Sequence, residues 1–168
     1  MEHQTTDGAA SKLLKRQVIL TLALASMLLF LALVFEDVGE LATVDWSELP
    51  LGLIVRYAVA MGIGGAIAGY ILMGLFGRPG VIGWGLSMTG GILVATFAGL
   101  LGSAIGLSPD LLSDGYQTRD IVAIGAGALV LPLAVIGWPV LLPVWIVLIA
   151  RAHMLARKRR QGSLPVLR

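Results

Sequence analysis

The sequence predicts an all-α, polytopic integral membrane protein with four transmembrane helices and both termini in the cytoplasm. Of its 168 residues, 57% are hydrophobic and only 13% are charged, about half the charged share of an ordinary soluble domain. Four uncharged runs are long enough to cross about 30 Å of hydrocarbon. The basic residues gather at alternate ends of these runs, which is the distribution that orients a membrane protein.

The first predicted span covers residues 17–35 and follows a basic flank, residues 1–16, which we expect to be disordered. The flank and the apolar run together resemble a signal peptide. However, the small-residue pattern Ala23-Leu24-Ala25 lies in the middle of the run, whereas a cleavage site normally closes it. We therefore interpret residues 17–35 as a retained helix that anchors the chain.

The second and third spans, residues 51–77 and 80–107, are joined by a short turn that contains Arg78, Pro79 and Gly80. Proline followed by glycine at the centre of a turn is typical of type II, because the glycine needs a positive φ. A link this tight predicts that the two spans are antiparallel neighbours.

Both of these spans carry small residues at four-residue spacing, which places them on one helix face. In membranes, helices associate where small residues let their backbones approach closely. We expect the rows of spans two and three to face each other; the alternative is a groove for a lipid, a pigment or a partner helix. The predicted packing residues, in the rows Ala58-Gly62-Ala66, Gly65-Gly69 and Ser87-Gly91-Ala95-Gly99-Ser103, are Gly62, Gly65, Gly69, Gly91, Ala95 and Gly99.

The fourth span is predicted over residues 121–150, and it contains Pro132, Pro139 and Pro143. Each proline removes a backbone hydrogen bond and clashes with the preceding turn. A helix of this length must tilt, kink or project beyond the bilayer. A broken helix at a transport site is one interpretation. We favour a kinked packing helix, because no charged or carboxamide side chain lies beside the prolines.

Orientation follows from the basic residues. Residues 151–168 form a basic tail, and the first loop is acidic without a single Lys or Arg. If both termini are cytoplasmic, ten of the twelve basic residues lie on that side, and only Arg56 and Arg119 lie outside. The tail predicts binding to anionic lipids, each basic residue contributing about 1 kcal/mol near an anionic surface. Its four consecutive candidates are Arg157, Lys158, Arg159 and Arg160. Nucleic acid is not an expected partner, because the tail has no interleaved aromatic residues.

Arg56 is the one charge inside a predicted span. Its long side chain can extend to the outer surface and meet Glu48 or Asp45. The alternative is a contact with a lipid phosphate or an anionic ligand.

Residues that carry chemistry are scarce. The chain has no cysteine, which excludes disulfides and thiolate sites, and its two histidines, His3 and His153, lie outside the spans. We therefore predict no catalytic residue, no metal site and no cofactor. The hydroxyls of Thr89, Thr96 and Ser103 recur every seven residues and could line a polar seam, although such groups more often bond to helix backbone.

The segment Gly69-Tyr70-Ile71-Leu72-Met73-Gly74, with the turn after it and Met88-Thr89-Gly90-Gly91, resembles the centre of the tellurite-resistance-associated TrgA-type membrane proteins. This resemblance implies about four spans and a stress or resistance role in the bacterial inner membrane. The glycine-rich hairpin is also similar to small transglycosylase-associated membrane proteins, a likeness that does not imply an enzyme.

The sequence thus predicts a non-enzymatic, multi-pass protein of the bacterial inner membrane. We expect it to act by packing, either as a subunit of a membrane complex with another protein or as a homo-oligomer. The alternative is a protein for small-solute permeation or stress resistance. An enzyme ranks last, because its acid or base would have to come from short loops.

Overall fold

The computed structural model describes residues 2–37, 50–137 and 139–162, with side chains in the first range from residue 8 to residue 35. These ranges are helical almost throughout and contain no strand. Four segments are long and apolar enough to cross a membrane, namely Gly8–Phe35, Leu51–Leu75, Gly80–Asp114 and Thr118–Gly137. The chain is therefore an all-α, multi-pass membrane protein, as predicted. Most of the acidic first loop, including Asp45 and Glu48, and the last six residues of the tail lie outside the described residues.

Helix α1 spans Glu2–Asp37. The N-terminal flank is therefore helical, whereas the sequence predicted that it is disordered. No proline interrupts the chain before Gln17, and the helix simply continues outward from its membrane segment. The buried face of that segment follows a helical period, with the side chains of Val18, Leu22, Ala25 and Leu29 at most 3% exposed.

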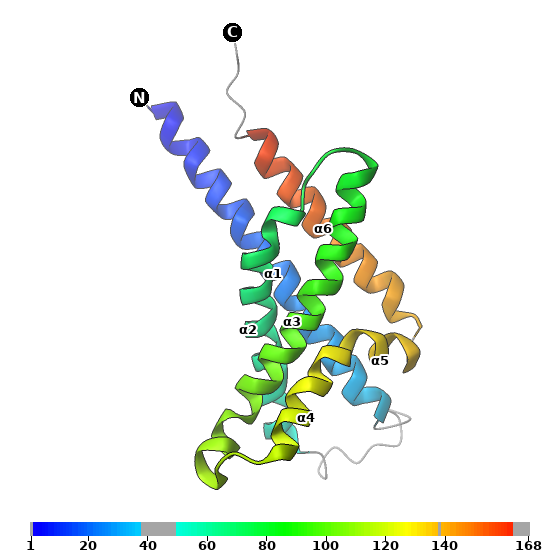
Figure 1. The fold of residues 1–168 in the computed structure, drawn as a ribbon. Helices are drawn as coiled ribbons and strands as arrows, with labels where there is room; N and C mark the ends of the chain where they lie inside the picture. The colour runs from blue at the N-terminus through cyan, green and yellow to red at the C-terminus, as the bar shows by residue number, and fades with distance from the viewer. Residues whose placement is uncertain (1, 38–49, 138, 163–168) are drawn as a thin grey trace.

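The predicted hairpin of spans two and three is confirmed. Helix α2 (Leu51–Leu72) ends in a short 3₁₀ turn, η1 (Met73–Leu75), and α3 (Gly80–Asp114) runs back beside it (Figure 1). In the turn, Pro79 has φ −72° and Gly80 has φ +77°, the positive φ that the sequence predicted. Gly77 also has a positive φ, of +78°.

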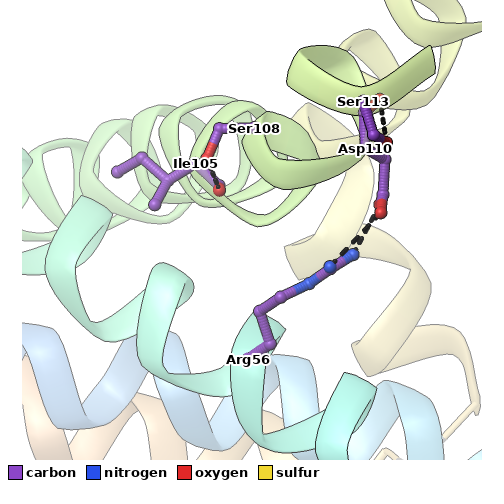
Figure 2. A network of polar contacts seen from close by, with 5 residues as sticks. All are labelled: Arg56, Ile105, Ser108, Asp110 and Ser113. Atoms are coloured by element: carbon purple, nitrogen blue, oxygen red, sulfur yellow. Dashed lines mark hydrogen bonds and ion pairs between the residues drawn. The ribbon is translucent and has the colours of Figure 1, made fainter.

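Helix α3 continues through Pro109 to Asp114, beyond the end predicted at residue 107. Pro109 has no N–H, so the carbonyl of Ile105 loses its helical partner. The hydroxyl of Ser108 donates to that carbonyl over 2.7 Å instead (Figure 2). This local replacement lets the helix pass through the proline.

The fourth span is not the single helix predicted over residues 121–150. The structure divides it into α4 (Thr118–Ala126), the 3₁₀ turn η2 (Gly127–Leu129), α5 (Val130–Gly137) and α6 (Leu141–Gly162). In a continuous helix, Pro139 and Pro143 would each remove one backbone hydrogen bond, and the two losses would lie about one turn apart. The helix therefore ends before Pro139, and Pro143 falls in the first turn of α6, where its missing N–H costs nothing.

The helices form an elongated bundle (Figure 1). The beginning of α1, the turn before α3 and the end of α6 lie at one end, which we call the basic end because Arg78 and Arg157–Arg160 lie there. The connection from α3 to α4 lies at the opposite end. Helix α6 packs against α1, and the break between α5 and α6 lies between the two ends of the bundle.

Candidate functional site

Helix α3 is the centre of the bundle, and two rows of small residues run along it. The row predicted to face α2, from Ser87 to Ser103, faces the C-terminal helices instead. Contact with α2 and η1 comes from the neighbouring row Gly90-Val94-Ala98-Gly102-Gly106. Side chains at Gly102 and Gly106 would overlap Met61 and Tyr57 of α2. The prediction that α2 and α3 meet through small residues is right, but the row assigned on α3 was wrong.

The glycines of α2 divide among three environments. Gly64 packs against the backbone of α3, where an added Cβ would lie 2.7 Å from the carbonyl oxygen of Ala98. Gly65 and Gly69 face α1 and would meet Ser26 and Leu22. Gly62, which we predicted to be a packing residue, has no atom within 4 Å of such a Cβ among the described residues, because it points away from both α1 and α3.

The predicted row on α3 packs closely against the broken C-terminal region. A Cβ on Gly99 would overlap the carbonyl of Gly127 in η2. A Cβ on Gly91 would lie 2.8 Å from a side-chain carbon of Ile149 and 3.0 Å from Trp145, both in α6. Ala95 is buried between these two glycines. The small residues on this face therefore hold η2 and α6 against α3.

His153 of α6 forms a buried polar cluster at the basic end. The Oγ of Ser87 lies 2.5 Å from its Nδ1, and the N–H of Gly77 donates to the same nitrogen over 3.3 Å. The ring stacks on Trp84, with ring centres 4.4 Å apart. Its Nε2 is buried without a hydrogen-bond partner among the described residues. One histidine thus ties α6, the turn before α3 and α3 together.

Burial lowers the pKa of His153, and the positive charge of Arg157 lowers it further. A lowered pKa favours the neutral ring, and a neutral ring can accept the hydrogen bond from the N–H of Gly77 at Nδ1. The lowered pKa and the hydrogen bond therefore indicate the same neutral state. A serine beside a histidine is also the core of nucleophilic catalysis. Here the side chain of Ser87 is fully buried, and its hydroxyl also lies 3.0 Å from the carbonyl of Gly83. We therefore interpret the Ser87–His153 pair as a contact that holds α3 and α6 together.

The apolar run ends at the charged residue Arg151, so His153 was not predicted to be a buried residue. The helical period itself continues past that point. Trp145, Ile149 and His153 are spaced by four residues, and all three are buried. This continued period is the signal that could have found it.

A basic pocket opens beside the cluster, and its positive charge comes from the tail. Its volume is about 550 Å³, and its lining is Tyr70, Met73, Gly74, Phe76, Ala156, Arg159 and Arg160. Arg160 is held in place by two carbonyls, since its Nε donates to Phe76 over 3.1 Å and its Nη2 donates to Gly74 over 2.9 Å. The Nη1 of Arg159 lies 3.4 Å from the sulfur of Met73. The ammonium of Lys15 in α1 lies 4.4 Å from the centre of the Tyr70 ring.

The other candidate residues of the tail have different surroundings. Arg157 lines a second cavity of about 280 Å³ with Gly77, Pro79, Gln161 and Arg160, so Arg160 borders both cavities. Lys158 is exposed. Arg78, in the turn, is exposed and approaches the carbonyl of Gly74 at 3.5 Å.

Arg56 lies at the opposite end and pairs with Asp110 of α3 at 2.6 Å (Figure 2). The two predicted partners, Asp45 and Glu48, lie outside the described residues. The side chains of Arg56 and Asp110 are 31% and 53% exposed. The ion pair therefore joins α2 to α3 at the rim of the bundle.

The three hydroxyls predicted to form a seam have different environments. Thr89 is exposed, Thr96 is half-buried and Ser103 is buried. Thr96 lines an apolar cavity of about 410 Å³ between α3 and the C-terminal helices, together with Pro132, Leu142 and Trp145.

Comparisons with protein-family models, with curated proteins and with solved structures each returned no match. In the described part of the chain, no group of three or more His, Asp or Glu side chains is placed to hold a metal ion.

Proposed function

We propose that this chain is a non-enzymatic assembly protein of the bacterial inner membrane, which works by packing against other membrane helices. These helices belong to a second copy or to another protein of a complex. The observation that carries the proposal is the broken fourth crossing. The resemblance to tellurite-resistance-associated proteins adds a stress-related setting for such an assembly.

If the fourth crossing runs from α4 through the first part of α6, the break leaves irregular backbone in a costly position. Helix α5 ends and α6 begins partway along the bundle (Figure 1), and Val140, just before α6, is 72% exposed. Hydrocarbon offers no hydrogen bonds, so irregular backbone at membrane depth is tolerated only where protein or a water-filled cavity covers it. A neighbouring helix over residues 139–140 would supply that cover.

The same region is poorly packed within its own chain. In the most apolar stretch of Thr118–Gly137, only 17% of the residues are buried, whereas 50% are buried in the most apolar stretch of α3. Membrane helices gain their association energy from close packing. Of the four spans, Thr118–Gly137 therefore gains the least packing energy from its own chain. Packing in an assembly would supply what the single chain lacks.

The absence of cysteine allows a direct test. A Val140→Cys variant carries a single thiol at the break, and a Val59→Cys variant carries one on the exposed face of α2, where Val59 is 52% exposed. With a thiol-attached benzophenone, which photo-cross-links to neighbouring C–H bonds and needs no amine, we expect Val140→Cys in native membranes to give one discrete larger product, of twice the monomer mass for a self-assembly. A monomer-only pattern, or equal products from both variants, would overturn the proposal.

We further propose that the basic end faces the cytoplasm, with both termini inside. The support is the charge distribution, because Lys and Arg are retained on the cytoplasmic side. Alkaline phosphatase and green fluorescent protein fused to either terminus test it. Fluorescent fusions without phosphatase activity are expected, and phosphatase activity at either terminus would contradict this orientation.

The second candidate function is permeation of a small solute. Its support is the cavity that Thr96 lines beside the broken crossing, since discontinuous helices line transport sites. Solute flux into reconstituted vesicles tests it. If the replacements Arg56→Gln and Thr96→Ala leave flux unchanged, this candidate fails.

A further inference from the structure

We propose that the basic pocket is a binding site for the phosphate group of an anionic membrane phospholipid. The site is more specific than the general attraction of a basic tail to a charged surface. It does not depend on whether the chain assembles with itself or with another protein.

The positive charge of the basic pocket is preorganised. The carbonyls of Phe76 and Gly74 fix the guanidinium of Arg160 before any ligand arrives. A planar guanidinium held in this way pairs with phosphate at little further entropic cost. Among the described residues, no carboxylate pairs with Arg160, so its charge is available to an anion.

The lining of the basic pocket combines charged and uncharged residues. Arg159 and Arg160 bring two positive charges to the opening, and Lys15 of α1 lies against Tyr70, one of the lining residues. The remaining wall carries no charge and is formed by Tyr70, Met73, Gly74, Phe76 and Ala156.

The basic pocket is continuous with the exposed apolar surface of α2. Tyr70 is 57% exposed and the next residue, Ile71, is 70% exposed on α2. A ligand whose phosphate sits against the arginines can therefore lay its acyl chains along α2. Basic pockets at the ends of membrane helices suit lipid headgroups for this reason, whereas a free phosphate ion would use only the polar half of the pocket.

The decisive comparison is between two charges of the same tail. Arg160→Gln removes a charge from the pocket, and Lys158→Gln removes one from an exposed position outside it. The purified full chain is incubated with equal amounts of phosphatidylglycerol and phosphatidylcholine, and bound lipid is counted by native mass spectrometry. We expect wild type to retain phosphatidylglycerol selectively, Arg160→Gln to bind it about tenfold more weakly, and Lys158→Gln to bind it within about twofold of wild type.

A second variant adds bulk to the pocket lining without changing charge. Gly74 lines the pocket, and a Cβ added there would meet no atom within 4 Å. We expect Gly74→Leu to reduce phosphatidylglycerol retention while the elution volume of the folded protein stays the same. This arm keeps the test decisive even if Arg160→Gln fails to fold.

Three results would overturn the proposal. Equal losses from Arg160→Gln and Lys158→Gln would reduce the effect to surface charge. Full retention in Gly74→Leu would place the lipid elsewhere. Displacement of the lipid by millimolar inorganic phosphate would make a soluble anion the ligand.

Discussion

The two faces of α3 use the same residue types against very different partners. On one face, Ala98, Gly102 and Gly106 meet the regular helix α2. On the other, Gly91 and Gly99 meet α6 and the 3₁₀ turn η2. Each face also has a polar link, Arg56–Asp110 on the α2 side and Ser87–His153 on the C-terminal side.

The difference shows what small residues contribute on each face. Against α2 they let two continuous helices approach. Against η2, Gly99 leaves room for a backbone carbonyl of a segment that is not a regular α-helix. We therefore expect the C-terminal face to tolerate less change, since a carbonyl in a turn cannot move aside as a flexible side chain can.

The largest effect is expected for Gly99→Ala. Its Cβ would overlap the carbonyl of Gly127, and overpacking of this kind costs about 1–3 kcal/mol or more. Thermal unfolding in a mild detergent, followed by size-exclusion chromatography, should show a clear loss of stability. Gly85→Ala is the matched control on α3, because a side chain there meets no atom within 4 Å. Equal stability of the two variants would mean that η2 does not rest on Gly99.

The sequence allowed the crossings and the hairpin to be predicted, because length, apolarity and the Pro79–Gly80 turn depend on local residues. It did not allow the partner of each face to be predicted. The rows that begin at Ser87 and at Gly90 both repeat every four residues, and they lie only about 60° apart around α3. Spacing identifies a face, but which helix covers it depends on contacts distant in the sequence.

A kinked helix was favoured over the broken crossing, and the buried histidine was missed, for a related reason. Three prolines predicted a disturbance but not whether the helix would bend or stop. Likewise, Arg151 ended the apolar run, although the buried period continues to His153 and Ala156. Charge patterns locate the membrane boundary, whereas packing continues beyond it. The pocket around Arg160 depends on carbonyls in η1 and the turn, which no sequence pattern specifies.

The polar link on the C-terminal side is expected to depend on pH. Burial holds the pKa of His153 below its ordinary value of about 6.5, so the unfolded chain binds the proton more readily. The stabilisation is complete above about pH 6.5 and declines as the pH falls below it, by about 1.4 kcal/mol for each pKa unit of difference.

A His153→Phe variant checks this pH dependence. Phenylalanine can keep the stack on Trp84 but cannot titrate, and it leaves the N–H of Gly77 without its acceptor, at a cost of about 1–3 kcal/mol. Thermal unfolding from pH 8 to pH 5 should show a lower midpoint at pH 8 and a smaller decline on acidification than in wild type. A variant that declines as steeply as wild type would show that other groups cause the pH dependence.

The polar link on the α2 side is expected to contribute least. Arg56 and Asp110 are close but partly exposed, and such ion pairs contribute at most about 1 kcal/mol. A double-mutant cycle with Arg56→Gln, Asp110→Asn and both together isolates the interaction from the other effects of each replacement. We expect the unfolding free energies to show a small coupling that shrinks in high salt, because exposed charges are screened. A coupling larger than the loss caused by His153→Phe would reverse the comparison, since the α2 face would then depend more on its charged link than the C-terminal face depends on its buried one.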